Sequence, residues 1–139
     1  MQEFILLLFI YLGIYTILSL GLNLIAGYTG LLSLCQAAFF AIGSYTSAIL
    51  MVKYPGHFWP VFLASGLTAA VCGLLIGLPT LRLKGDYLAI ATLGFGEIVK
   101  NVILNWDSVT RGPMGISGIP APVLFGIELS DKLSYLLLI

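Results

Sequence analysis

One carboxylate, Glu97, stands inside an apolar stretch that runs from Tyr87 to Trp106. It follows Tyr87 at a distance of about 15 Å along a helix, near the middle of a bilayer core about 30 Å thick. A carboxylate at that depth is costly and indicates by default a path for a substrate or an ion. Lys100 lies three positions later on the same helical face, so the two side chains are predicted to form an ion pair.

Three roles for Glu97 follow from this placement. The first is a structural ion pair with Lys100 in the protein interior. The second is a carboxylate that lines a substrate path or a gate. The third arises if Gly94-Phe95-Gly96 breaks the helix and leaves Glu97 at a boundary.

A second group of polar residues surrounds a break in the apolar sequence at Gly27-Tyr28-Thr29-Gly30. Lipid offers no partner to a free backbone amide, so such a break must be buried in protein or line a wet cavity. An exposed helix N-terminus beside it could hold the carboxylate of a zwitterionic substrate. The alternative is that the polar side chains only cap the unwound segment. The candidates for the substrate path, besides Glu97, are therefore Asn23, Tyr28, Thr29 and Gln36.

The sequence contains no recognisable catalytic set. The single histidine, His57, lies in a short polar connection, and metal ligation needs several converging ligands. Cys35 and Cys72 lie in apolar segments without C-x-x-C spacing and are interpreted as small hydrophobic residues that face neighbouring helices. A nucleophile with a base beside it is also missing from the pattern. We therefore expect no enzyme activity, no metal site and no cofactor in this chain.

The composition predicts the elements that must position these residues. Of the 139 residues, 60% are hydrophobic and 9% are charged, whereas soluble domains are about 25% charged. The formal net charge is zero, so there is no basic surface for nucleic acid. No charged side chain occurs from Phe4 to Val52. That run is too long for one membrane span of about 20 residues and must form two.

The sequence therefore predicts an all-α fold, a polytopic bundle of transmembrane helices in a single membrane region over 1–139. The predicted spans cover about 4–25, 32–52, 58–81 and 87–106, and another begins at 133. Because the sequence stops inside this last apolar run, a fragment of a longer protein is expected. Residues 107–131 hold too many Gly and Pro for a regular span. They are expected to form a loop of fixed shape, docked through Ile116, Ile119 and Phe125.

Small residues recur at helical spacing on two of the predicted spans. Ala37 and Ala41 begin one such stripe, and Ala69, Gly73 and Gly77 form another. Stripes of this kind favour close helix packing, and the alternative is that they line a pore. Orientation in the membrane is left open, because two Lys or Arg residues lie on one side and three on the other.

Two stretches resemble branched-chain amino acid ABC transporter permeases of the LivM type. The first is GLNLIAGYTGLLSL from Gly21, which runs into AAFFAIGSYT from Ala37 to Thr46. The second is LRLKGDYLAIATLGFGEIV from Leu81, which continues to GPMGISGIP at 112–120. The chain departs from the family at Cys35-Gln36, where a Gly-His pair is usual. The resemblance also leads us to expect that an amino-terminal span, which many members carry, is missing here.

The resemblance implies a permease subunit in a bacterial or archaeal cell (inner) membrane. Its implied partners are membrane lipid, a second permease of LivH type, two cytoplasmic ATPases that use ATP, and an extracytoplasmic binding protein that delivers leucine, isoleucine or valine. It also implies that loop 107–131 is external and that the turn with Arg82 and Lys84 is cytoplasmic. The alternatives are an importer of urea or short amides, and a truncated membrane assembly module that does not transport.

Overall fold

The computed structural model describes residues 1–28, 30, 33–120, 123–124 and 127–128. Within these residues the chain is almost entirely helical, and the predicted all-α membrane fold is confirmed. The elements are α1 (Gln2–Asn23), a π-helical turn η1 (Leu24–Tyr28), α2 (Gln36–Lys53), α3 (Phe58–Thr80), α4 (Asp86–Asn105), α5 (Asp107–Thr110), a 3-10 turn η2 (Gly112–Met114), and the antiparallel strand pair β1 (Val123–Leu124) and β2 (Ile127–Glu128).

In the described part of the chain, three helical segments are long and apolar enough to cross a membrane, namely Glu3–Tyr28, Phe58–Thr80 and Asp86–Asn105. α2 is not among them. It is 18 residues long and begins at Gln36, whereas the sequence predicted a span from 32. The difference arises because residues 33–35 form a non-helical approach to α2. The break also begins later than predicted, since the π-helical turn carries the first helix through Gly27 to Tyr28. The predicted span beginning at 133 lies outside the described residues.

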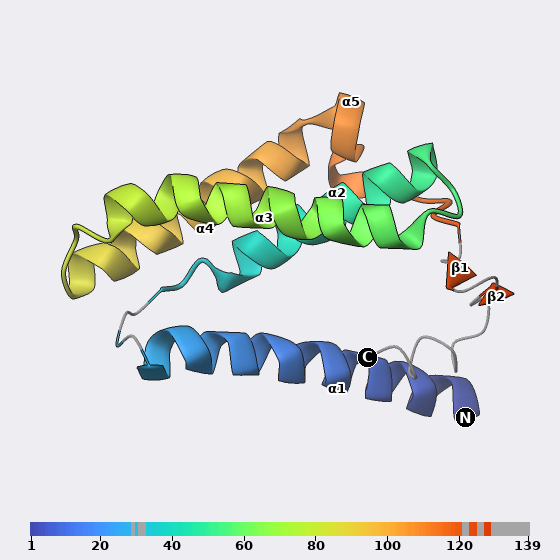
Figure 1. Cartoon of the computed structure of the whole chain (residues 1–139), viewed down its shortest axis with the longest axis horizontal. Helices are drawn as coiled ribbons and strands as arrows, with labels where there is room; N and C mark the ends of the chain where they lie inside the picture. Colours follow the sequence, from blue (N-terminus) through green and yellow to red (C-terminus); the bar gives the residue numbers. More distant parts are fainter. Residues whose placement is uncertain (29, 31–32, 121–122, 125–126, 129–139) are drawn as a thin grey trace.

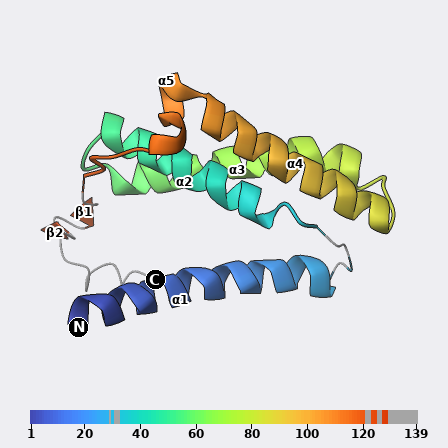
Figure 2. The same ribbon diagram turned by 180° about the vertical axis from the view of Figure 1, so that it is seen from behind.

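Helices α2, α3 and α4 lie side by side, and α1 runs apart from them (Figures 1 and 2). The closest packing joins α2 and α3. A Cβ atom built on Gly43 would lie 4.0 Å from Ala69 Cβ, and one on Gly73 would lie 3.8 Å from the Phe39 ring. The stripe of Ala69 and Gly73 therefore packs α3 against α2, the role that its spacing favoured.

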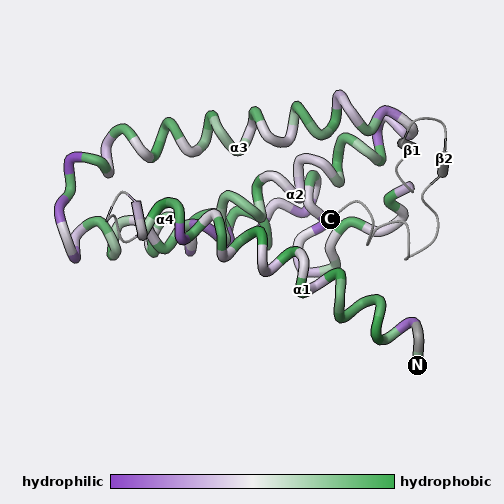
Figure 3. Tube along the Cα trace, turned by 60° about the horizontal axis from the view of Figure 1, so that its bottom comes forward, coloured by the Kyte–Doolittle hydropathy of each residue, from purple (hydrophilic) through white to green (hydrophobic). Residues whose placement is uncertain are grey.

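The core of the described chain is small. Cys35, Ala38 and Val99 are buried together where α2 meets α4. Partly buried aromatic rings extend this contact, with the ring centroids of Phe39 and Phe95 5.8 Å apart. By contrast, the apolar part of the candidate span Glu3–Tyr28 has no residue buried inside the chain. The tube of α1 and α3 is mainly apolar, and polar residues gather in the connections at the ends of α3 (Figure 3).

The loop that follows α4 is described without a gap to Pro120. Thr110 is buried, and its hydroxyl donates to the carbonyls of Ile103 and Trp106 while accepting the N–H of Gly112 at 3.3 Å. Ile119 and Pro120 line a cavity of about 610 Å³ with residues of α2 and α3. Ile119 thus lies beside α2 and α3, and the docking of the whole loop stays a prediction. Phe125 lies outside the described residues.

Candidate functional site

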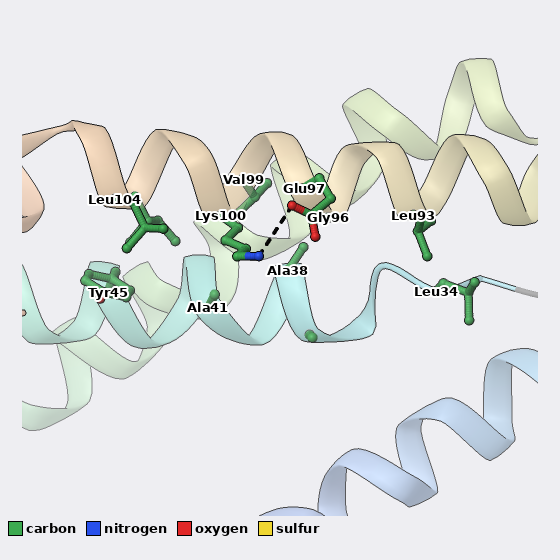
Figure 4. A pocket seen from close by; sticks show the side chains of 12 residues that line it. Leu34, Ala38, Ala41, Tyr45, Leu93, Gly96, Glu97, Val99, Lys100 and Leu104 are labelled. Atoms are coloured by element: carbon green, nitrogen blue, oxygen red, sulfur yellow. Dashed lines mark hydrogen bonds and ion pairs between the residues drawn. The ribbon is translucent and has the colours of Figure 1, made fainter. Parts of the chain in front are cut away.

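The candidate site is a groove between α2 and α4, here called the α2–α4 groove. It has a volume of about 440 Å³ and opens to the surface of the chain (Figure 4). The α2 side is built mainly from Ala37, Ala38, Ala41 and Tyr45, and Leu34 lies just before that helix. The α4 side carries Leu93, Gly96, Glu97, Val99, Lys100, Ile103 and Leu104. The lining of the groove is therefore mostly apolar, with one pair of opposite charges on the α4 side.

The charged pair lies in the middle of an unbroken helix. α4 continues through Gly94-Phe95-Gly96, so the alternative in which these residues end the helix is wrong. Glu97 lies eleven residues after Asp86, or about 17 Å along the helix axis. Lys100 Nζ is 3.5 Å from Glu97 Oε2, and this ion pair is drawn as the dashed line in Figure 4.

The pair is not buried by this chain. The side chains of Lys100 and Glu97 are 63% and 59% exposed, whereas the structural role assumed an interior position. The reason is that α2 presents alanines opposite the charges, and these are too short to cover them. Two exposed charges at mid-helix are stable in a membrane only beside water, a polar ligand or another protein segment.

Two asparagines continue the polar surface along α4, a feature that the sequence reasoning missed. Asn101 donates its side-chain amide to the carbonyl of Glu97 at 2.8 Å, and Asn105 donates likewise to Asn101. The signal was present, because Glu97, Asn101 and Asn105 are spaced by four residues on one helical face. Because these bonds stay within the helix, the charged groups of Glu97 and Lys100 remain available to a ligand.

The break before α2 is held against α4 by a buried hydroxyl. Leu34 N–H donates to Thr92 Oγ1 at 3.0 Å, and Thr92 Oγ1 donates in turn to the carbonyl of Ala89 at 3.0 Å. Thr92 is only 2% exposed and lies about 9 Å along α4 from Asp86. The break therefore lies beside α4 and inside the stretch that this helix would span in a membrane. Lipid there could not provide a hydrogen-bond partner for the Leu34 amide. Thr92 is a second functional candidate that the sequence reasoning missed, although it is a polar residue in an apolar stretch.

The predicted break residues that the structure describes lie outside the α2–α4 groove. Gln36 Nε2 lies 2.8 Å from the position that a Cβ would take on Gly21, so this side chain contacts α1. Asn23 Oδ1 lies similarly close, 2.6 Å, to the Cβ position of Gly27. Tyr28 is 89% exposed. Thr29 lies outside the described residues.

The structure therefore does not bring Asn23, Tyr28 or Gln36 into the α2–α4 groove, whereas Glu97 lines it. Asn23 lies beside Gly27 in the π-helical turn, and the capping role of these side chains stays a prediction. Within the described part of the chain, no group of three His, Cys, Asp or Glu residues could hold a metal ion.

An ion pair in the middle of an apolar helix that is long enough to span a membrane, near a helix break, is the geometry expected of a transport protein. Comparison with known protein families agrees, since the family described as the permease component of the branched-chain amino acid transport system matches residues 4–136. The chain belongs to this family. It is a multi-pass membrane protein, and the LivM-type resemblance seen in its motifs is confirmed.

Two curated members of the permease family show the relationship in detail. The chain is 56% identical over 117 residues to the high-affinity branched-chain amino acid transport system permease protein LivM of Escherichia coli (strain K12), and 55% identical over 117 residues to LivM of Salmonella typhimurium (strain LT2). Each match covers 84% of this chain and 28% of the relative, so the chain spans little more than a quarter of their length. No solved structure matches it.

Proposed function

We propose that this protein is a permease subunit of an ABC importer that moves branched-chain amino acids across the inner membrane of a bacterial cell. The observation that carries the proposal is the 56% identity to LivM over 84% of the chain. A match of 117 residues in a chain of 139 must include the break and the α2–α4 groove. The matched region therefore includes the part of the fold that could face a substrate.

Partners follow from the same relationship. The permease pairs with a second permease of LivH type and is driven by two cytoplasmic ATPases, which bind and hydrolyse ATP. An extracytoplasmic binding protein delivers the substrate. This chain itself requires no cofactor and performs no enzymatic step.

The orientation proposed for the helices places the loop after α4 outside. That loop lies at the same end of the bundle as the connection between α2 and α3 (Figure 1). The turn between Thr80 and Asp86, with Arg82 and Lys84, lies at the opposite end and faces the cytoplasm. The external end is then available to the binding protein. This orientation rests on the family resemblance, because the counts of Lys and Arg, two against three, do not separate the two sides.

Uptake of radiolabelled leucine tests the proposal. A strain deleted for its own branched-chain amino acid permease is given the complete gene together with the genes of the partner subunits. We expect leucine uptake that depends on ATP and that excess isoleucine or valine inhibits. Uptake of radiolabelled urea without uptake of leucine would assign the permease to short amides instead.

A further inference from the structure

We propose that the α2–α4 groove is a binding site for an amino-acid zwitterion during its passage through the permease. In this arrangement the Glu97 carboxylate accepts hydrogen bonds from the substrate ammonium, and the Lys100 ammonium donates hydrogen bonds to the substrate carboxylate. The aliphatic side chain of the substrate packs against the apolar wall around Ala37 and Ala41. The inference rests on the proposed function and assigns a substrate site to it.

The charges of the groove match those of the substrate. Lys100 Nζ and Glu97 Oε2 are 3.5 Å apart, at the outer limit of a hydrogen bond, so neither group is saturated by the other. A lysine has three donors, and an ionised glutamate has two acceptor oxygens. A free amino acid carries its ammonium and carboxylate on one carbon atom, so a single molecule can bond both residues. Bonds between ionised groups are the stronger class of hydrogen bond.

The shape of the groove also fits a small aliphatic molecule. Its volume of about 440 Å³ falls within the range of about 300–1,000 Å³ that is usual for small-molecule sites. Ala37 and Ala41 leave room opposite the charges, and Leu93 and Ile103 supply apolar surface beside them. Figure 4 shows the charged pair facing this alanine wall. A polar head group and a branched aliphatic tail are therefore both accommodated.

The groove is also placed where a substrate must pass. Glu97 lies near the middle of α4, and the groove reaches Leu34 in the break before α2. Interrupted helices at mid-membrane depth are tolerated where they are buried in protein or line a cavity, and transporters use them to form substrate sites. The Leu34 amide is already bonded to Thr92. The charged groups that the groove offers to a ligand are therefore those of α4, and Tyr45 adds a hydroxyl on the α2 wall.

Replacing either of two alanines by leucine tests whether transport requires open space in the groove. Ala37→Leu fills the groove from an exposed position on α2, and Ala70→Leu makes the same change on an exposed position of α3 that does not line it. Both variants are made in the complete protein with its partner subunits. We expect Ala37→Leu to lower maximal leucine uptake by about tenfold or more, with normal membrane levels and partner co-purification, and Ala70→Leu to have no effect.

A charge exchange tests the role of the pair. The double variant Glu97→Lys with Lys100→Glu keeps an ion pair on α4 but inverts its direction, so the substrate tail no longer meets the apolar wall. We expect its uptake to fall by about tenfold or more, as for Glu97→Gln alone. The ATPase rate stimulated by the substrate-loaded binding protein, measured in proteoliposomes, should stay near that of the wild type, because docking is not altered.

Three results would overturn the proposal. Uptake near the wild-type rate in the exchanged variant would make the pair structural. Wild-type uptake by Ala37→Leu would show that the groove is not on the path. Loss of partner co-purification in Ala37→Leu would make the groove a subunit interface. In each case, leucine uptake by the unchanged protein would leave the proposed function standing. If the unchanged protein took up no leucine, the proposed function and the proposed groove site would both be wrong.

Discussion

At the scale of single residues, Thr92 holds the broken segment in place. Its hydroxyl accepts the Leu34 amide and donates to the Ala89 carbonyl, so it connects the approach to α2 with the first third of α4. A valine at this position keeps the shape and removes both bonds. The Leu34 amide then loses its partner in a segment that lipid cannot satisfy.

Thr92→Val is therefore expected to lower the free energy of unfolding by about 1–3 kcal/mol, the cost of leaving a buried donor unsatisfied. Thermal unfolding of the purified protein in detergent measures this change. Thr92→Ser retains the hydroxyl and should lie closer to the wild type. Thr68→Val is a matched control, because the Thr68 hydroxyl bonds only within its own helix. Equal stability of Thr92→Val and the wild type would show that water replaces the hydroxyl.

For Glu97 we expect a substitution to have little effect on the free energy of unfolding, in contrast to Thr92, because the Glu97 side chain is exposed. An exposed ion pair contributes about 0–1 kcal/mol to stability, so Glu97→Gln should change the free energy of unfolding by less than about 1 kcal/mol. Chemical denaturation in detergent checks this value. The 59% exposure of Glu97 thus separates loss of transport from loss of folding. A decrease of about 3–5 kcal/mol, typical of breaking a buried pair, would mean that another part of the assembly covers the groove.

At the scale of elements, the loop after α4 has a defined shape built from short turns. α5, the left-handed Arg111 and the 3-10 turn η2 follow one another within nine residues of the end of α4. A Cβ on Gly112 would meet the backbone carbonyl of Leu104 at 2.9 Å, so only glycine allows this close return of the chain. Ser108 and Ser117 remain exposed on the loop.

Thiol labelling of this loop tests the proposed orientation. In a background without Cys35 and Cys72, cysteines at Ser108 and Ser117 should react with a membrane-impermeant reagent in intact cells. A cysteine at Lys84, in the turn at the other end of the bundle, should react only after the membrane is opened. Labelling in the reverse order would invert the topology. Labelling is expected at both loop positions because their side chains are exposed.

At the scale of the whole molecule, the buried residues of the described chain lie in α2, α3 and α4, in the approach to α2 and in the loop after α4. Met51 and Val61 are buried where α2 meets α3, whereas α1 exposes large apolar side chains along its length. In a membrane those side chains lie against lipid or other protein segments. Stability should therefore depend on the three-helix group far more than on α1.

Two substitutions that each shorten a large apolar side chain to alanine compare the contributions of the three-helix group and of α1 to stability. Met51→Ala should lower the free energy of unfolding by about 2 kcal/mol, the low end of the usual range, because a cavity forms while lipid and detergent weaken the transfer term. Leu20→Ala, at a side chain that is 64% exposed, should change it by less than about 0.5 kcal/mol. Thermal unfolding in detergent compares the two. Equal effects would show that α1 packs against a further segment of the protein.

Much of this arrangement could be predicted from the sequence because the bilayer imposes simple rules. The need for about 20 apolar residues per span predicted helices that end near Thr80 and Asn105, and charges and glycines marked the turns between them. The family resemblance came from the motifs around Gly27 and Gly96. The Glu97–Lys100 contact followed from helical spacing alone, since residues three apart share a face.

What only the tertiary structure decided is which polar groups meet across helices. Helical spacing cannot say that Thr92 lies opposite Leu34, which is 58 positions away, or that Gln36 turns toward Gly21. It also cannot say whether Glu97 is covered, because burial depends on the size of the residues that the neighbouring helix presents. The short alanines of α2 leave the charged pair open and create the groove. Local sequence determines the helices, whereas the contacts between them determine which charges remain available to a ligand.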